Sequence, residues 1–189
     1  MTTGAPAIIE NHVTSFWPAR PRPQLVPVSG PVNKSIVDFS VAVCPPASPT
    51  DAWVYVSVGA WSVETQEMAR YEFVVTSPLE SAIHFETLAM VAHFHADPRY
   101  AVYPGKVLNI GRPWLPGSTC THLLVSRPFP FGPDFERCVD ANLQLRLLWL
   151  MPITTSEAEF ARTNGVDALE DAFEQHAVDT LDPTRVSIA

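Results

Sequence analysis

The segment Leu143 to Ile153 is the feature that most constrains the fold. It reads Leu-Gln-Leu-Arg-Leu-Leu-Trp-Leu-Met-Pro-Ile, and its second half is continuously apolar. A strand that is covered on both faces reads as an unbroken apolar run, whereas a strand with one solvated face alternates. The run is well short of the roughly 20 apolar residues that cross a bilayer. We therefore expect a central β-strand with protein on both sides of it.

Two short helices are predicted directly after this strand. Thr154-Thr-Ser-Glu157 has the spacing of a capping box, Asn164-Gly165 that of a helix C-terminus, and Asp167 with Glu170 repeats the capping-box spacing. The apolar residues expected to join the core from these helices are Phe160, Leu169 and Phe173.

Several strands are predicted before the central one. The ranges Ser35–Cys44, Ala52–Val58 and Arg70–Thr76 alternate apolar and polar residues, and short connections suit antiparallel pairing. Shorter strands are expected at Lys106–Ile110 and Thr121–Ser126. With 47% hydrophobic and 17% charged residues, the chain has the composition of a packed globule. We expect an α+β fold in which helices pack on a mixed, largely antiparallel β-sheet.

A longer helix is predicted between these strands. Ser77-Pro-Leu-Glu80 has the pattern of an N-terminal capping box, and Asp97-Pro98 is expected to end the helix. A helical wheel places Leu79, Ile83, Met90 and Phe94 on one apolar stripe with Val91 beside it. Phe85, Leu88 and Ala92 lie on the far side, so a cover over that face is the alternative.

The first 34 residues are expected to form a proline-rich arm, followed by one domain over residues 35–189. Proline fixes φ and lacks an amide donor, so the arm is predicted to be extended and not helical. The adjacent aromatic residues Phe16 and Trp17 are expected to anchor it to the domain.

Charge and cysteine content exclude several classes of function. The net charge of −8 opposes binding to nucleic acid, because that affinity comes largely from Lys and Arg. Residues 153–189 carry eight acids against two arginines, which is either a solvated helix face or a surface that steers a basic partner. Three separated cysteines, with no signal-peptide or membrane-span pattern, lead us to expect a cytoplasmic protein with reduced thiols. No phosphate-binding or zinc-protease motif occurs, so no cofactor is expected.

Two constellations could carry chemistry. His93, His95 and Asp97 have metal-ligating side chains and would suit a small metal-assisted hydrolase. On a helix, however, His93 and His95 point about 200° apart, which favours histidines that face solvent at a helix end. Cys120 and His122 could form a nucleophile and base, but on a strand they share a face by periodicity alone, and Cys120 is expected in the core.

The order of elements and two motifs resemble the suppressor-of-fused (SUFU) domain family. The motifs are Tyr103-Pro-Gly-Lys-Val-Leu-Asn-Ile-Gly-Arg112, followed by Pro113 and Trp114, and Leu147-Leu-Trp-Leu-Met-Pro-Ile-Thr-x-x-Glu157. The resemblance covers roughly Ile36 to Ala189 and implies a SUFU-like α/β sandwich.

The resemblance also implies a function in protein binding and not in catalysis. Animal members sequester a transcription factor by gripping a peptide, and bacterial members resemble immunity proteins that neutralise toxins. The animal peptide site corresponds loosely to Phe94–Lys106, although Lys106 stands near the position of an acidic residue there. We expect the partner to be another protein, with a basic toxin domain as one candidate. The remaining alternative for the function is a homo-oligomeric structural module. The predicted contact residues are Tyr103, Lys106, Arg112 and Trp114.

Overall fold

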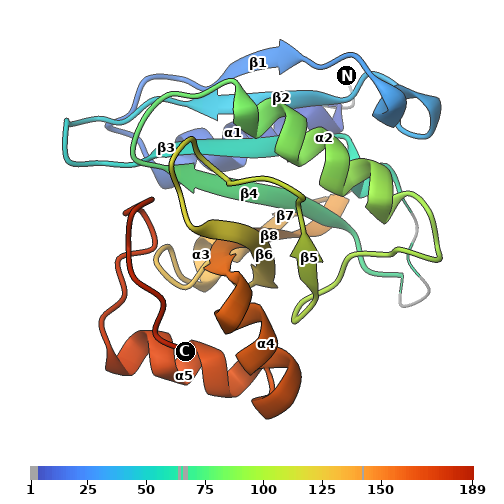
Figure 1. Cartoon of the computed structure of the whole chain (residues 1–189). Helices are drawn as coiled ribbons and strands as arrows, with labels where there is room; N and C mark the ends of the chain where they lie inside the picture. Colours follow the sequence, from blue (N-terminus) through green and yellow to red (C-terminus); the bar gives the residue numbers. More distant parts are fainter. Residues whose placement is uncertain (1–3, 64, 66–67, 142) are drawn as a thin grey trace. The chain divides into compact units, whose positions relative to one another are not determined.

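A computed structural model of the protein describes residues 4–63, 65, 68–141 and 143–189. These residues form two compact units (Figure 1). The first unit comprises the described residues up to Val102 together with Arg127–Trp149, and the second comprises Tyr103–Ser126 and Leu150–Ala189. Each unit is therefore built from two separate stretches of sequence.

The described residues form helices and strands in the following order. They are α1 (Ala5–Phe16), β1 (Gln24–Pro27), η1 (Pro31–Lys34), β2 (Ser40–Cys44), β3 (Trp53–Val58), η2 (Ala60–Ser62), β4 (Tyr71–Ser77), α2 (Ile83–His95), β5 (Val107–Asn109), β6 (Cys120–Ser126), α3 (Pro133–Glu136), β7 (Arg137–Asp140), β8 (Leu143–Thr154), α4 (Thr155–Asn164) and α5 (Val166–Gln175), where η marks a 3-10 helix. The sheet is mixed and mostly antiparallel, so the expected α+β class is confirmed.

The sheet of the first unit has the order β1-β2-β3-β4-β8, with β7 also paired to β8. Neighbouring strands are antiparallel except β4 and β8, which run parallel with Tyr71 opposite Arg146. The predicted central strand is confirmed, because β8 is buried along almost its whole length. The predicted strands over 52–58 and 70–76 match β3 and β4, whereas β1 and β7 were not predicted.

Helices α1 and α2 cover opposite faces of β2, β3 and β4 (Figure 1). Ile9 and Val13 of α1 join a buried cluster with Val54 and Val56 of β3. The intervening residue Tyr55 instead packs its ring against His84 of α2. The alternation of β3 thus places successive side chains under different helices, as the period of a strand requires.

The proline-rich start of the chain is not the extended arm that composition suggests. Residues 5–16 form α1, with Pro6 in the first turn, where a residue without an amide donor costs the helix no hydrogen bond. Phe16 and Trp17 do anchor this region, since their rings pack against Phe131 and Phe135 with centroids 4.8 to 6.4 Å apart.

Two details of the longer helix differ from the prediction. Ser77 remains the last residue of β4, paired with Trp53, and α2 begins only at Ile83 without a side-chain cap. The buried face is also not the predicted stripe: Leu79 is exposed, and the residues that α2 buries are His84, Thr87, Leu88, Val91, Ala92 and His95. Apolar residues occur on both sides of this helix, so their distribution alone does not identify the core face. The predicted end before Asp97 is confirmed.

A buried carboxyl group supports the connection from β3 to β4 in the first unit. Glu72 is 0% exposed and accepts hydrogen bonds from the Ser57 hydroxyl, from the Gly59 amide at 2.7 Å and from the Trp61 amide at 3.2 Å. Gly59 has φ of 130°, a conformation that glycine adopts without strain. Burial raises the pKa of Glu72 to about 8, although these hydrogen bonds oppose the increase.

In the second unit, β5 pairs antiparallel with β6, and α4 starts from the end of β8. The predicted capping box is confirmed: the Thr154 hydroxyl accepts from the Glu157 amide, and the Glu157 carboxylate accepts from the Thr154 amide at 2.8 Å. Gly165, with φ of 95°, ends α4 as expected. No side chain caps α5, however, and that helix starts at Val166 and not at an Asp167 cap.

The C-terminal segment is held to this unit by a buried ion pair. Arg185 donates from Nη1 and Nη2 to the two Glu157 oxygens, each at 2.6 Å, and from Nη2 to the Pro152 carbonyl at 3.1 Å. The Ile188 amide donates to the same carboxylate at 3.3 Å. Glu157 therefore has two functions, capping α4 and binding the last residues of the chain.

Candidate protein-binding surfaces

Two of the predicted contact residues, the exposed Tyr103 and the half-buried Lys106, form a pair in the second unit. The side chain of Tyr103 is 55% exposed, and the Lys106 ammonium lies 5.4 Å from the centroid of its ring. The turn between them is closed by a hydrogen bond of 3.1 Å from the Lys106 amide to the Tyr103 carbonyl. Partial burial lowers the pKa of Lys106. Aromatic residues are enriched at protein interfaces, and a cation over an aromatic face is attracted by the ring quadrupole.

The other two predicted contact residues lie in the loop before β6. Arg112 is half-buried and donates to the Pro113 carbonyl at 3.2 Å. Trp114 is only 2% exposed, so its indole is a core side chain of this unit and not part of an exposed surface. The proline- and glycine-rich surroundings that suggested an exposed position instead form turns that lead the tryptophan inward.

A hollow of about 540 Å³ lies between the segment Gly105–Asn109 and α4 in the second unit. Gly105 and Val107, which flank Lys106 in sequence, form part of its lining, and α4 supplies Glu159 and Arg162. The α4 residues were not predicted as site residues, because nothing local in their sequence relates them to β5.

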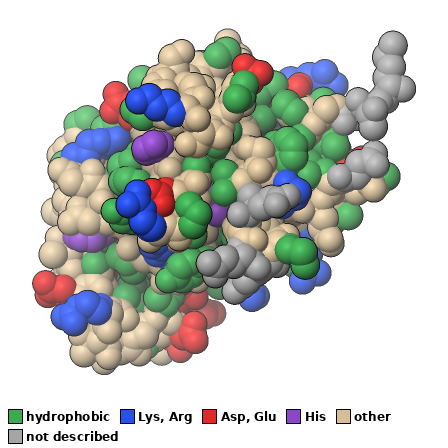
Figure 2. All heavy atoms as spheres, turned by 90° about the vertical axis from the view of Figure 1, so that its right-hand side faces the viewer, with side chains coloured by type: hydrophobic (Ala, Val, Ile, Leu, Met, Phe, Trp, Pro, Cys, Tyr) green, Lys and Arg blue, Asp and Glu red, His purple; other side chains and the backbone are tan. Residues whose placement is uncertain are grey.

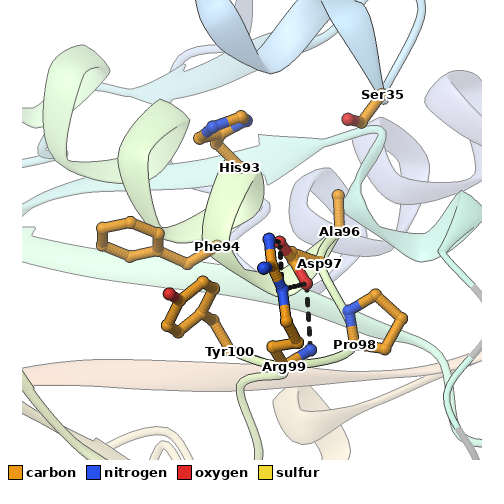
Figure 3. Close-up of a pocket in the computed structure, with 8 residues that line it drawn as sticks. All are labelled: Ser35, His93, Phe94, Ala96, Asp97, Pro98, Arg99 and Tyr100. Atoms are coloured by element: carbon orange, nitrogen blue, oxygen red, sulfur yellow. Dashed lines mark hydrogen bonds and ion pairs between the residues drawn. The ribbon is translucent and has the colours of Figure 1, made fainter.

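A second pocket, of about 430 Å³, lies at the C-terminal end of α2 in the first unit (Figure 3). Its lining includes His93 and Phe94 from the helix and Asp97, Arg99 and Tyr100 from the turn that follows. Figure 3 shows the Phe94 and Tyr100 rings next to each other beside the Asp97–Arg99 pair; their centroids are 6.2 Å apart and their planes are tilted by 51°.

Asp97 and Arg99 are closely paired in this pocket. Arg99 donates from Nη2 to Asp97 Oδ2 at 2.6 Å and from Nε to Oδ1 at 3.0 Å, and its backbone amide also donates to Oδ1. These hydrogen bonds hold the pKa of Asp97 down to about 2. The guanidinium also lies 5.5 Å from the centroid of the Tyr100 ring.

The histidines do not assemble the metal site that was considered. His95 is 1% exposed, its ring packs against Tyr71 and Phe73, and its Nδ1 accepts from the Val102 amide at 3.3 Å. The expectation that it faces solvent was wrong. His93 and Asp97 share the pocket, but within the described ranges no group of three His, Cys, Asp or Glu side chains is arranged to hold a metal ion.

Cys120 is a core residue, as expected. It is 1% exposed, and burial raises its pKa, which disfavours the thiolate that a nucleophile requires. The Nδ1 atom of His122 is 3.0 Å from the Thr121 hydroxyl. The arrangement does not prepare Cys120 for attack on a substrate.

One face of the molecule mixes polar and apolar groups. On the face drawn in Figure 2, hydrophobic side chains reach the surface between charged side chains of both signs. Of the helices that the structure describes, none combines the length and apolar character needed to cross a membrane.

Comparisons with known proteins identify the fold. The family model described as Suppressor of fused protein (SUFU) matches residues 36–186. The crystal structure of a protein from Neisseria gonorrhoeae FA 1090, named as a SUFU homolog, is 33% identical over 98% of this chain and 97% of that chain, with a TM-score of 0.87. No curated protein sequence matches.

More distant structures share the fold. The chain in the structure described as the Sufu-Fu complex is 14% identical, with a TM-score of 0.72 over 97% of this chain and 91% of that one. Drosophila Suppressor of Fused is 13% identical, with a TM-score of 0.71, and this chain spans 51% of its length. Together with the family match over residues 36–186, these findings show that the chain belongs to the suppressor of fused family.

Proposed function

We propose that this protein is a non-catalytic protein-binding domain that acts as a bacterial immunity protein and neutralises a partner toxin. Membership of the SUFU family supports binding to a protein, since one relative is described in a Sufu-Fu complex. The bacterial source of the 33% identical relative supports the bacterial role. The buried state of Cys120 and His95 supports a function without catalysis.

The observation that carries the proposal is the exposed Tyr103 ring with Lys106 over it. Exposed aromatic residues are costly in water and supply much of the affinity at protein interfaces. Lys106 over the ring and the neighbouring hollow add a charge and a concave surface within the same unit. Arg112 is assigned to the edge of this surface, and Trp114 supports it from the core.

The overall charge supports a basic toxin as the partner. The net charge of −8 attracts a cationic protein and speeds encounter at low ionic strength. Most of this charge lies in residues 153–189, which belong to the same unit as Tyr103.

The test begins with the genes adjacent to this one: a toxin gene found there is co-expressed with this protein, and the lack of any such gene would contradict the immunity role. The unaltered protein is expected to restore growth and to co-purify with the toxin, whereas Tyr103→Ala, and Lys106→Ala by removing the cation over the ring, are expected to weaken both effects. Phe129→Ala is the matched control, because Phe129 is an aromatic residue that is 60% exposed in the first unit. Full protection by both variants would refute the assignment of this surface.

Sedimentation of the purified protein separates this function from that of a homo-oligomeric module. A monomer that forms a stoichiometric complex with the toxin supports the proposal. A stable oligomer that does not bind the toxin would support the structural alternative.

A further inference from the structure

The hollow between β5 and α4 combines an apolar floor with a charged rim. Its volume of about 540 Å³ lies within the range of small-molecule sites, which are mostly apolar with a few polar groups that fix the orientation of the ligand. Exposed Glu159 and Arg162 stand on the rim. The apolar side chains of the lining are Val107, Ala158, Ala161 and Val166.

The two charged side chains of the rim have no partner within the chain. In the part of the chain that the structure describes, no ion pair or side-chain hydrogen bond involves the Glu159 carboxylate or the Arg162 guanidinium. Residues three apart on a helix lie on one side of it, with Cβ atoms about 5–6 Å from each other. A ligand in the hollow therefore meets a carboxylate and a guanidinium close together, and it displaces no internal partner from either.

Strands β5 and β6 add two hydrogen-bond donors to the hollow, at Asn109 and its opposite residue His122. The Asn109 Oδ1 atom accepts from the Gly111 amide at 2.8 Å, so the NH₂ group of this side chain is left for a ligand. The His122 Nδ1 atom lies 3.0 Å from the Thr121 hydroxyl. With that hydroxyl donating to Nδ1, the neutral ring carries its proton on Nε2 and can donate it to a carboxylate.

We propose that this hollow binds a free α-amino acid with an aliphatic side chain. Glu159 pairs with its ammonium group and Arg162 with its carboxylate, to which Asn109 and His122 also donate. The aliphatic side chain lies on the apolar floor. A ligand with a single charge would satisfy one side chain of the rim and be repelled by the other, whereas an amino acid carries both charges on one carbon atom. The inference goes beyond the proposed function and does not depend on the partner being a toxin.

The probe for this hollow is L-leucine. We expect NMR titration of the full chain to shift the backbone amide signals of residues 105–109 and 155–162. Glu159→Gln and Arg162→Gln should each lower the affinity at least about threefold, because each removes one charge-assisted bond. Ala158→Leu should abolish the shifts by filling the hollow, and leucine is well tolerated in a helix.

Matched controls isolate the zwitterion as the ligand. Glu174→Gln, at an exposed carboxylate on α5, should leave the titration unchanged. N-acetyl-leucine lacks the ammonium charge and leucinamide lacks the carboxylate, so each should bind at least about threefold more weakly than leucine. Equal binding of the three compounds, or no shift at about 10 mM leucine, would overturn the inference. Leucine binding by a protein that binds no toxin would uphold it and refute only the proposed function.

Discussion

Arg185 and Glu157 form a buried ion pair across 28 positions of the sequence, with both nitrogen–oxygen distances at 2.6 Å. Burial alone would raise the pKa of Glu157, but hydrogen bonds from Arg185 and the Thr154 amide lower it below its ordinary value. The same carboxylate caps α4, so the start of that helix and the C-terminal segment depend on each other.

Removing one partner of this pair should be strongly destabilising. Arg185→Met leaves a buried carboxylate without its cation, which typically costs about 3–5 kcal/mol. We expect urea unfolding to show this loss, and the double variant Arg185→Met/Glu157→Gln to recover part of it. Equal stability of Arg185→Met and the unaltered protein would show that the pair is not formed in solution.

Glu72 should make the stability of the first unit dependent on pH. Its pKa in the folded protein is about 8, above the ordinary value of 4.5, so the folded state binds the proton more tightly. The stabilisation of the folded state by protonated Glu72 is fully present below pH 4.5 and is lost as the pH rises through 8. Each unit of difference in pKa corresponds to about 1.4 kcal/mol, so the loss is on the order of a few kcal/mol.

Urea unfolding at pH 5, 7 and 9 on the unaltered protein and on Glu72→Gln measures this effect. The glutamine variant should lose the decline with pH that belongs to this group, whatever its absolute stability. If the free energy of unfolding fell with pH in parallel for the two proteins, a group other than Glu72 would be responsible for the pH dependence.

Replacing Trp114 should affect stability before it affects binding. Its side chain is 2% exposed, and truncation of a buried tryptophan to alanine typically costs about 3–5 kcal/mol. We expect a lower midpoint of thermal unfolding for Trp114→Ala. Tyr103→Ala should leave that midpoint nearly unchanged, because Tyr103 is 55% exposed. A native midpoint for Trp114→Ala would contradict its burial.

The three cysteines should react slowly with thiol reagents in the folded protein. Cys44, Cys120 and Cys138 are free and buried, and burial raises their pKa values, to about 12 for Cys44 and about 11 for Cys138. A colorimetric thiol assay should detect them only after denaturation. Rapid labelling of the native protein would show that at least one of them is accessible.

Sequence patterns predicted the elements that local signals determine. The apolar run of β8 and the Thr154–Glu157 capping box act within a few residues, and both are confirmed. The prediction of an extended arm at the start of the chain was wrong because proline was counted as a helix breaker. Pro6 lies in the first turn of α1, where proline is favourable.

The parts that were missed depend on distant residues. His84 and His95 are buried by strands far away in sequence, and a helical wheel treats both as polar. Nothing beside Arg185 indicates that its partner is Glu157. The end of α2 was considered from the sequence for His93, His95 and Asp97 and, through the family resemblance, for Phe94–Lys106. The ring contact and ion pair of Arg99 were not predicted, because they require the turn in three dimensions.

The two units interrupt each other along the chain, and this order has a consequence for synthesis on the ribosome. The first unit needs Arg127–Trp149, which are translated only after the first stretch of the second unit, Tyr103–Ser126. The second unit in turn awaits the residues that follow Trp149, including Arg185 near the end. Neither unit can complete its fold on a nascent chain that stops at residue 126: the first needs Trp149 to have left the ribosome, and the second needs Arg185.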